Sequence, residues 1–301
     1  MDDAPDAAAA AAESEHATGH RPRSLSPSRA ADFKSCPLLY RFRAIDRIPE
    51  RPSTDAVRGT VVHAVLERLY DLPPDQREPA TAQAMVEPQW QAVVSDDPRL
   101  AALFEGDQEG QAAWLESARR LVADYFTLED PRRLQPAERE FLVETSLEDG
   151  PALKGIIDRL DIAPDGAVRV VDYKTGGAPR AVFEAKALFQ MKFYALVLWR
   201  LRGAVPRLLR LIYLKDRDTL SYTPDEQELV RFERTLRAIW SAIDHATEAR
   251  DFRPSPSPLC GWCDYKPLCP AYGGTPPPFP ALDPVQPAGP EADAADAASA
   301  G

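Results

Sequence analysis

Two aspartates and a lysine in the middle of the chain have residue types and spacing that could support chemistry. Asp158 closes the run Gly155-Ile-Ile-Asp, and Asp172 and Lys174 belong to the run Val-Val-Asp-Tyr-Lys. Residues two apart in a β-strand share a face, so both carboxylates should project from the apolar sides of neighbouring strands. A divalent cation would satisfy two buried carboxylates that are costly when unpaired. The alternative is a buried ion pair between the acids and Lys174 with no ligand.

This set suits metal-assisted hydrolysis of phosphodiesters. The reaction needs a cation that neutralises developing charge and acidifies a bound water, and a positive group or base beside the attacking oxygen. Asp158 and Asp172 would hold the cation, and Lys174 would be the positive group. His63 could add a nitrogen ligand, although a single helical histidine also serves as a packing residue. Glu138 and Glu140 also stand near the start of the predicted sheet, and their roles stay open.

Four cysteines form a second candidate ligand set. Cys260, Cys263 and Cys269 follow the order C-x2-C-x5-C, and the only other cysteine, Cys36, lies far upstream. Because no thiol is left over, the sequence predicts one four-thiolate metal site that ties the two ends of a domain together. Four thiolates suit zinc as well as a 4Fe-4S cluster. Disulfides are disfavoured, because the spacing is metal-like and no export signal is expected.

The helices that must position these residues are predicted from apolar periodicity and capping residues. His63 falls in a predicted helix over 57–70. Cys36 falls at a break between two helices, because Ser26-Pro27 and Cys36-Pro37 each place proline at a helix start. Further helices are predicted over 80–94, 111–126 and 180–202, and a last one follows a capping box at Thr223 to Glu226 and runs to about residue 249.

The period of the apolar residues changes to two from Glu138 onward. This alternation predicts a three-stranded β-meander over 141–147, 153–162 and 168–173, with a turn at Pro164-Asp165-Gly166. The meander carries both Asp158 and Asp172. Another strand is predicted over 208–214, after the helix at 180–202. The order of elements indicates an α/β domain.

Gly155-x-x-Asp158 and Asp172-Tyr-Lys174 are followed on the next predicted helix by Gln190-x-x-x-Tyr194. With these motifs the chain resembles the RecB-family nuclease domain of the PD-(D/E)XK superfamily. The cysteine pattern is similar to the iron-sulfur version of that domain, found in AddB-type subunits and CRISPR-associated RecB-like nucleases. The resemblance covers about residues 24–272. It implies a restriction-endonuclease-like core with a central mixed sheet flanked by helices, an N-terminal helical segment and a C-terminal four-cysteine region.

The resemblance also implies roles for individual residues. It makes His63, Asp158, Asp172 and the backbone carbonyl of Tyr173 the ligands of Mg²⁺ or Mn²⁺, and Lys174 the catalytic lysine. It favours a 4Fe-4S cluster over zinc at the cysteines. Gln190 and Tyr194 would contact substrate or order the active site; the alternative is a helix face that packs on the sheet.

Composition limits the domain to the middle of the chain. Residues 1–24 and 273–301 are rich in Ala, Pro, Asp and Glu and are expected to be disordered tails around one domain at 25–272. The tails hold −3 and −4 of the net charge of −11. Contacts with DNA would therefore come from local patches such as Arg41 to Arg51 or Arg200 to Arg210, unless these are solvated helix faces. With no membrane segment and no export signal, a cytoplasmic location is expected.

The sequence thus predicts a metal-dependent DNA nuclease, acting as an exonuclease on single strands or duplex ends in recombination and repair. No G-x-x-x-x-G-K-[ST] motif occurs, so ATP hydrolysis by a P-loop would fall to a helicase partner. One alternative is trimming of new spacers with CRISPR adaptation proteins. Another is a non-catalytic iron-sulfur module that binds DNA or a helicase.

Overall fold

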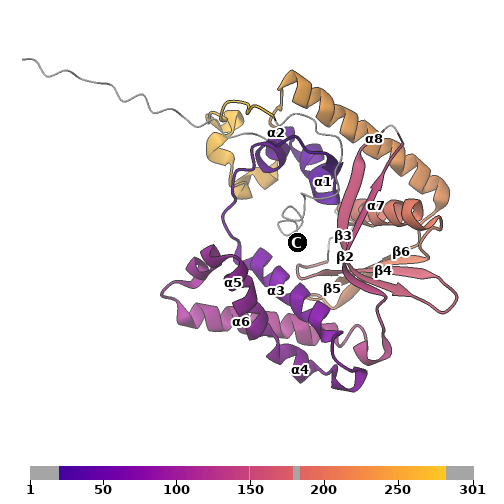
Figure 1. Cartoon of the computed structure of the whole chain (residues 1–301). Helices are drawn as coiled ribbons and strands as arrows, with labels where there is room; N and C mark the ends of the chain where they lie inside the picture. The colour runs from indigo at the N-terminus through magenta and orange to yellow at the C-terminus, as the bar shows by residue number, and fades with distance from the viewer. Residues whose placement is uncertain (1–19, 149, 179–183, 283–301) are drawn as a thin grey trace, which may run out of the picture.

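A six-stranded mixed β-sheet lies at the centre of the molecule, and helices cover both of its faces (Figure 1). The computed structural model describes residues 20–148, 150–178 and 184–282. The strand order is β1-β3-β4-β5-β6, and β2 pairs with the other edge of β3. The β1–β3 and β4–β5 pairs are parallel and the others antiparallel. The strands are β1 (Ser24–Leu25), β2 (Glu138–Ser146), β3 (Ala152–Ile162), β4 (Val168–Lys174), β5 (Leu208–Tyr213) and β6 (Asp218–Tyr222).

This architecture confirms the predicted fold class, and the three-stranded meander forms where the alternation placed it. The turn between β3 and β4 depends on Gly166, whose φ of 82° lies in the left-handed region that glycine adopts freely. Two strands were not predicted. β1 spans only two residues, and β6 is a mostly polar strand at the sheet edge. Neither has enough alternating apolar residues to indicate a strand.

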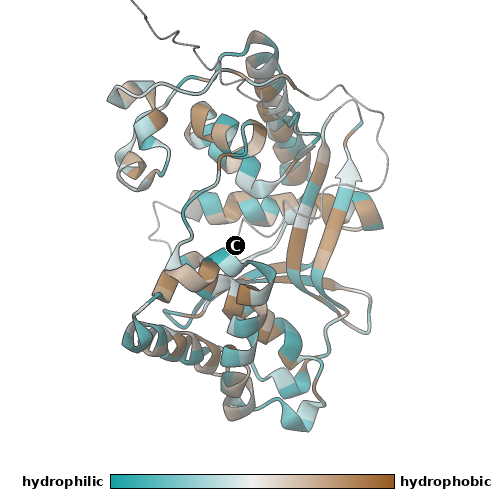
Figure 2. Cartoon of the chain, turned by 60° about the vertical axis from the view of Figure 1, so that its left-hand side comes forward, coloured by the Kyte–Doolittle hydropathy of each residue, from teal (hydrophilic) through white to brown (hydrophobic). Residues whose placement is uncertain are grey.

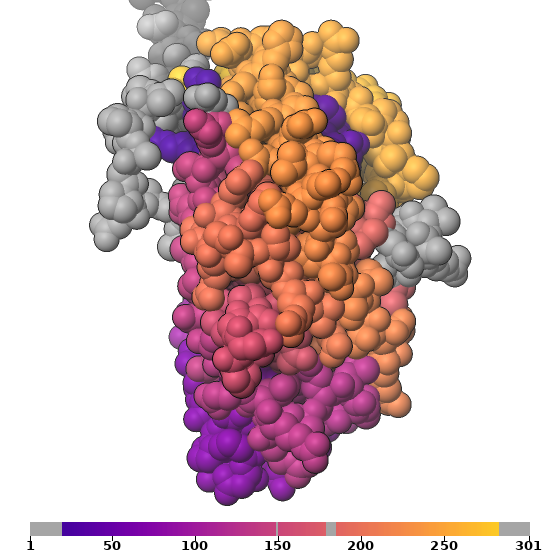
Figure 3. All heavy atoms as spheres, turned by 90° about the vertical axis from the view of Figure 1, so that its right-hand side faces the viewer, coloured from indigo at the N-terminus to yellow at the C-terminus, as the bar shows by residue number. Residues whose placement is uncertain are grey.

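One face of the sheet is covered by the helices from the two ends of the domain. The helices are α1 (Pro27–Ser35), α2 (Pro37–Tyr40), α7 (Glu184–Arg202) and α8 (Glu226–Ala249). Leu160 and Val170 of the sheet pack in one core with Phe193 of α7 and Leu236 of α8. The segments around residues 200–250 fill most of this side of the molecule in Figure 3.

The opposite face is covered by a layer of helices that precedes the meander in the chain. Its helices are α3 (Thr54–Leu69), α4 (Pro79–Ala84), α5 (Val86–Asp96) and α6 (Gln108–Tyr125). A second core forms here, in which Val171, Tyr173 and Ile212 of the sheet meet the helices. The strands are mostly hydrophobic, whereas the longer helices alternate between hydrophilic and hydrophobic residues (Figure 2). The single helix predicted over 80–94 is two helices that meet at Met85.

The predicted helix starts are mostly correct. Ser26 caps α1, with its side chain accepting a hydrogen bond from the Arg29 backbone N–H, and Cys36 lies in extended conformation between α1 and α2. The capping box predicted at Thr223 is wrong, because Asp225 is the cap of α8 and accepts from the Glu228 N–H. Gly203, with a φ of 70°, follows α7 as expected. Short helical turns occur at Arg41–Ile45, Pro74–Gln76, Pro98–Phe104, Pro131–Arg133, Pro258–Trp262, Lys266–Leu268 and Pro270–Tyr272.

The sheet is kinked where β2 and β3 pass Glu140 and Asp158. Glu140 has a φ of 43°, which is strained for a residue with a side chain. Leu153, Ile157 and Leu160 all pack in the core beneath α7 and α8, so the buried face of β3 changes from odd to even positions at this point. The expectation of unbroken alternation through Asp158 is therefore wrong. The kink leaves Asp158 at a corner of the sheet.

The C-terminal cysteine segment packs against the first helices, beside α2 in Figure 1. The Tyr265 hydroxyl donates to the Ile48 carbonyl at 2.7 Å, and the Phe42 ring lies 5.2 Å from the Tyr265 ring. Further along, Arg41 donates to the Pro277 carbonyl at 2.6 Å, and the Phe279 ring stacks on Phe252. Contacts therefore extend beyond the expected limit at residue 272. Residues 1–19 and 283–301 of the expected tails lie outside the described residues.

No helix in the described ranges has both the length and the apolar character that a bilayer crossing requires.

Candidate active site

The predicted site residues converge from four elements of the fold. His63 comes from α3, Asp158 from β3, Asp172 and Lys174 from β4, and Gln190 from α7. Nδ1 of His63 lies 3.5 Å from Oδ2 of Asp158, and Nζ of Lys174 lies 2.8 Å from Oδ2 of Asp172. Gln190 donates through Nε2 to Oδ1 of Asp172 at 2.9 Å. Residues far apart in the chain thus form one cluster at the kinked corner of the sheet.

The two aspartates are brought together because β3 and β4 separate at this point. The paired residues run from Ile162 and Val168 to Arg159 and Val171, and the ladder stops before Asp158 and Asp172. The Asp158 side chain takes the place of the next strand partner, since its Oδ2 accepts the Tyr173 backbone N–H at 2.6 Å. The opening between the strands therefore presents both carboxylates side by side.

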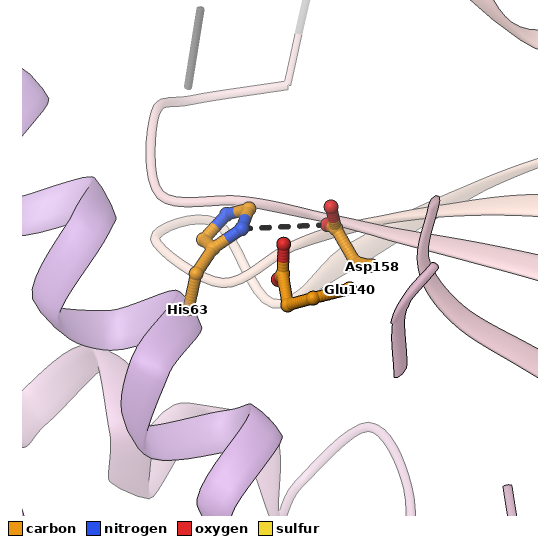
Figure 4. Close-up of side chains that lie close together, drawn as sticks. All are labelled: His63, Glu140 and Asp158. Atoms are coloured by element: carbon orange, nitrogen blue, oxygen red, sulfur yellow. Dashed lines mark ion pairs between the residues drawn. The ribbon is translucent and has the colours of Figure 1, made fainter. Parts of the chain in front are cut away.

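Glu140 is a member of the site whose role the sequence left open. Figure 4 shows the side chains of His63, Glu140 and Asp158 close together. Their ligand atoms all lie within 4.8 Å of one another. Glu140 sits on β2 opposite Asp158, between the pairs formed by its two neighbours. Its left-handed backbone conformation turns its side chain toward His63. Strain of this kind is concentrated at functional sites. No pattern in the sequence signals a positive φ at a glutamate, so only its position near the sheet start pointed to it.

The carboxylates of the site repel one another. Burial, together with the Asp158 charge, raises the pKa of Glu140 to about 7. Burial, together with the Asp172 charge, raises the pKa of Asp158 to about 6, although His63 and Lys174 act in the opposite direction. Burial disfavours the charge of Lys174, but the adjacent Asp172 and Asp158 outweigh this and raise its pKa. The lysine therefore stays charged beside an excess of negative charge.

The excess of negative charge at the site fits a divalent cation. The donor set is one imidazole and several carboxylates, which suits Mg²⁺ or Mn²⁺. The cluster at His63, Glu140 and Asp158 offers three ligand atoms, and Asp172 lies next to Asp158 across the strand opening. A buried ion pair alone does not account for the site, because Lys174 is one cation against three acids. The backbone carbonyl of Tyr173 stays a predicted ligand.

Gln190 and Tyr194 share one face of α7 but have different surroundings. Gln190 contacts Asp172 and so belongs to the cluster. Tyr194 is 6% exposed and packs on the sheet, where a Cβ added at Gly155 would lie 2.8 Å from its Cε1. The glycine of the Gly155-x-x-Asp158 motif thus makes room for the tyrosine ring. A role for either residue in contacting substrate stays a prediction.

The four predicted cluster ligands come together in one pocket. They line it with residues of α2 and of the segment 254–272; the four are Cys36, Cys260, Cys263 and Cys269. None of them forms a disulfide. The Ser255 N–H donates to Sγ of Cys36 at 3.4 Å, and the Ser257 N–H donates to Sγ of Cys260 at 3.3 Å. The Ser257 N–H also lowers the pKa of the Cys260 thiol.

The arginine patches are largely paired with acids. Arg43 contacts Asp32 at 2.7 Å and Glu50 at 2.6 Å, and Arg200 contacts Glu233. Pairing of this kind lowers the local positive potential. The sites of DNA contact stay a prediction.

Comparison with known proteins agrees with the observed fold. A profile of the PD-(D/E)XK nuclease superfamily matches residues 24–270. The Gene 69 protein of Mycobacterium phage D29 is 25% identical over 272 residues, and that of phage L5 is 23% identical over 290; each match covers 82% of this chain and 96% of the relative. The crystal structure of a "Putative exonuclease" from Eubacterium rectale superposes with a TM-score of 0.54 at 14% identity, covering 81% of this chain and 88% of that one. The chain belongs to the PD-(D/E)XK nuclease superfamily.

Proposed function

We propose that this protein is a metal-dependent DNA exonuclease that degrades single strands or duplex ends in recombination and repair. The observation that carries the proposal is the joining of His63, Asp158, Asp172 and Lys174 in one cluster at the opening between β3 and β4. Membership of the superfamily supports phosphodiester hydrolysis. Cleavage from DNA ends and a cytoplasmic role in repair are proposed from the RecB-like motifs. The name of the structural neighbour, a "Putative exonuclease", agrees with cleavage from ends.

The residues of the site would have different roles in hydrolysis. His63, Glu140, Asp158, Asp172 and the Tyr173 carbonyl are the candidate ligands of Mg²⁺ or Mn²⁺. A bound cation supplies charge neutralisation and acidifies water. Lys174 keeps its charge at neutral pH and would orient and stabilise the attacking oxygen. Gln190 holds Asp172 in place from α7.

The proposal is tested with end-labelled DNA. Anaerobically purified protein is incubated with single-stranded, duplex and covalently closed circular DNA, with Mg²⁺, Mn²⁺ or a chelator. We expect loss of label from linear substrates in either metal, no cleavage with chelator, and no cleavage of circles. Cleavage of circles would replace exonuclease by endonuclease action. DNA binding without cleavage of any substrate in either metal would favour the non-catalytic module instead.

We also propose that the cysteines hold a 4Fe-4S cluster. The four thiols line one pocket, and backbone N–H groups point at two of the sulfurs, which is typical of cluster sites. Such a cluster would join α2 to the C-terminal segment.

The partner of such a nuclease would supply unwinding. The sequence contains no P-loop motif, so a helicase or other repair protein would open the duplex. CRISPR adaptation proteins are the alternative partners, in which case the substrate would be a new spacer. Co-purification of tagged protein from its own host, with identification of the bound proteins, separates these two assignments.

A further inference from the structure

A buried arginine lies behind the active site, next to Asp158 in the sequence. The Arg159 side chain is 1% exposed, and its guanidinium contacts four side chains from other elements. Its Nη1 donates to the hydroxyls of Tyr173 at 2.6 Å, Tyr70 at 3.0 Å and Tyr125 at 3.2 Å. Its Nη2 lies 2.8 Å from Oε2 of Glu129. One guanidinium thus organises three tyrosines and a buried carboxylate.

The elements that meet at Arg159 are those that carry the candidate ligands. Tyr70 ends α3, the helix of His63. Arg159 itself follows Asp158 on β3, and Tyr173 stands between Asp172 and Lys174 on β4. The His63 ring also meets the edge of the Tyr173 ring, with centroids 6.1 Å apart. Tyr125 is different, because it ends α6, which carries no residue of the site.

Tyr173 links this network to the site through its backbone. Its hydroxyl accepts the shortest of the three hydrogen bonds from Nη1 of Arg159, and its N–H donates to Oδ2 of Asp158 at 2.6 Å. A displacement of the Tyr173 ring would therefore shift the peptide groups on both sides of it. Those peptide groups set the separation of Asp158 from Asp172. Groups of this kind, which hold ligands without touching the ion, strongly influence metal affinity.

We propose that Arg159 is a positioning residue, which holds Tyr173 and thereby fixes Asp158 and Asp172 at the separation that a divalent cation requires. The inference rests on the proposed metal-dependent function. A charge with five donors in a planar fork suits this task, because it bonds several acceptors in fixed directions at once. Two carboxylates neutralise the charge of the Arg159 guanidinium. Glu129 lies beside Nη2, and Oδ1 of Asp161 lies 3.2 Å from Nε.

Two tyrosine variants test the proposal. Replacing Arg159 itself would remove the nearest cation from the buried Glu129, whose other arginines lie 3.8 and 3.9 Å away, and could unfold the protein. Tyr173→Phe and Tyr125→Phe each remove one hydroxyl that accepts from the same Nη1 and leave the rings in place. Melting temperature measures what each variant costs the fold. Isothermal titration of the metal-free protein with Mn²⁺ measures affinity without reference to activity.

We expect Tyr173→Phe to weaken Mn²⁺ binding about tenfold or more, a size typical of groups that support ligands. Tyr125→Phe should lower the melting temperature at least as far, because its hydroxyl also bonds the Tyr70 hydroxyl and Oε2 of Glu129. It should leave Mn²⁺ affinity as in the unmodified protein. If both variants bind Mn²⁺ equally, whether at the original or a reduced affinity, Arg159 has only a structural role. If the unmodified protein binds no Mn²⁺ at all, the proposed function fails and this inference fails with it.

Discussion

Nδ1 of His63 lies 3.5 Å from Oδ2 of Asp158, at the point where α3 meets the kinked corner of β3. This contact joins the helical layer at the start of the domain to the sheet that follows it. Glu140 completes the group from β2. A divalent cation at this site would therefore connect two layers of the fold as well as serve hydrolysis, so its binding should stabilise the protein.

Replacing Glu140 should affect stability and metal binding in opposite directions. Glu140→Gln removes one of the mutually repelling charges, so the metal-free variant should melt at a higher temperature than the unmodified protein. The same change removes a charged ligand, and Mn²⁺ affinity should fall on the order of tenfold or more. Thermal melts with chelator and calorimetric titration with Mn²⁺ measure the two effects. Glu138→Gln, at an exposed position on the same strand, is the control and should change neither. Unchanged Mn²⁺ affinity in Glu140→Gln would remove Glu140 from the ligand set.

The stability of the metal-free protein should depend on pH through the same carboxylates. The pKa of Asp158 is raised from 3.8 to about 6 and that of Glu140 from 4.5 to about 7, mainly by burial. The folded state therefore binds these protons more tightly than the unfolded state. Their contribution to the free energy of unfolding is largest below pH 4 and is lost as the pH rises toward 7.

Melting temperatures with chelator across this pH window measure the effect. Because other groups also titrate, the comparison is with Glu140→Gln, which should show a smaller loss of stability from pH 4 to 7. Saturating Mg²⁺ at pH 7 to 8 should restore the stability of the unmodified protein. Identical pH profiles for the two proteins would show that Glu140 titrates with its ordinary pKa.

How much of this site the sequence could predict depends on the residue. The D-x-K spacing and the alternation of β4 locate Asp172 and Lys174 correctly, because period-two patterns specify strand faces directly. His63 is also on the predicted helix. Glu140 could not be assigned, since its orientation depends on a positive φ at a non-glycine residue, and local sequence preference does not predict such strain.

Arg159 illustrates a second limit of sequence reasoning. A charged residue in a strand, next to a candidate ligand, would be expected on a solvated face, yet it is buried. Its partners Tyr70, Tyr125 and Glu129 come from segments well upstream in the chain. Compensation of a buried charge depends on tertiary contacts, and a pattern within one strand contains no information about them.

The cysteine site should contain iron. Protein purified without oxygen should be brown, absorb toward the blue end of the visible spectrum and contain about four irons per chain. Cys263→Ser should lose the colour and lower the melting temperature, because the cluster joins α2 to the C-terminal segment. Metal analysis and visible spectra measure both. Stoichiometric zinc without iron would overturn the cluster and leave a four-cysteine zinc site in its place.

Gly155 should tolerate no side chain. A Cβ at this position would lie 2.8 Å from Cε1 of the buried Tyr194, so Gly155→Ala must displace the ring or the strand. Overpacking of this kind costs about 1–3 kcal/mol of stability. Denaturant unfolding of Gly155→Ala is compared with that of Gly261→Ala, where a Cβ would meet nothing within 4 Å. Equal stability of the two variants would show that Tyr194 moves aside freely.

Lys174→Ala tests the central claim most directly. The change removes the positive group beside Asp172 and leaves every candidate ligand in place, so Mn²⁺ and DNA should still bind. Cleavage of end-labelled single-stranded DNA under single-turnover conditions should fall on the order of a hundredfold or more. Lys192→Ala, which removes a lysine paired with Glu228 on the same side of the sheet, should cleave at the rate of the unmodified protein. Equal cleavage rates for Lys174→Ala and Lys192→Ala would contradict the assignment of this cluster as a nuclease active site.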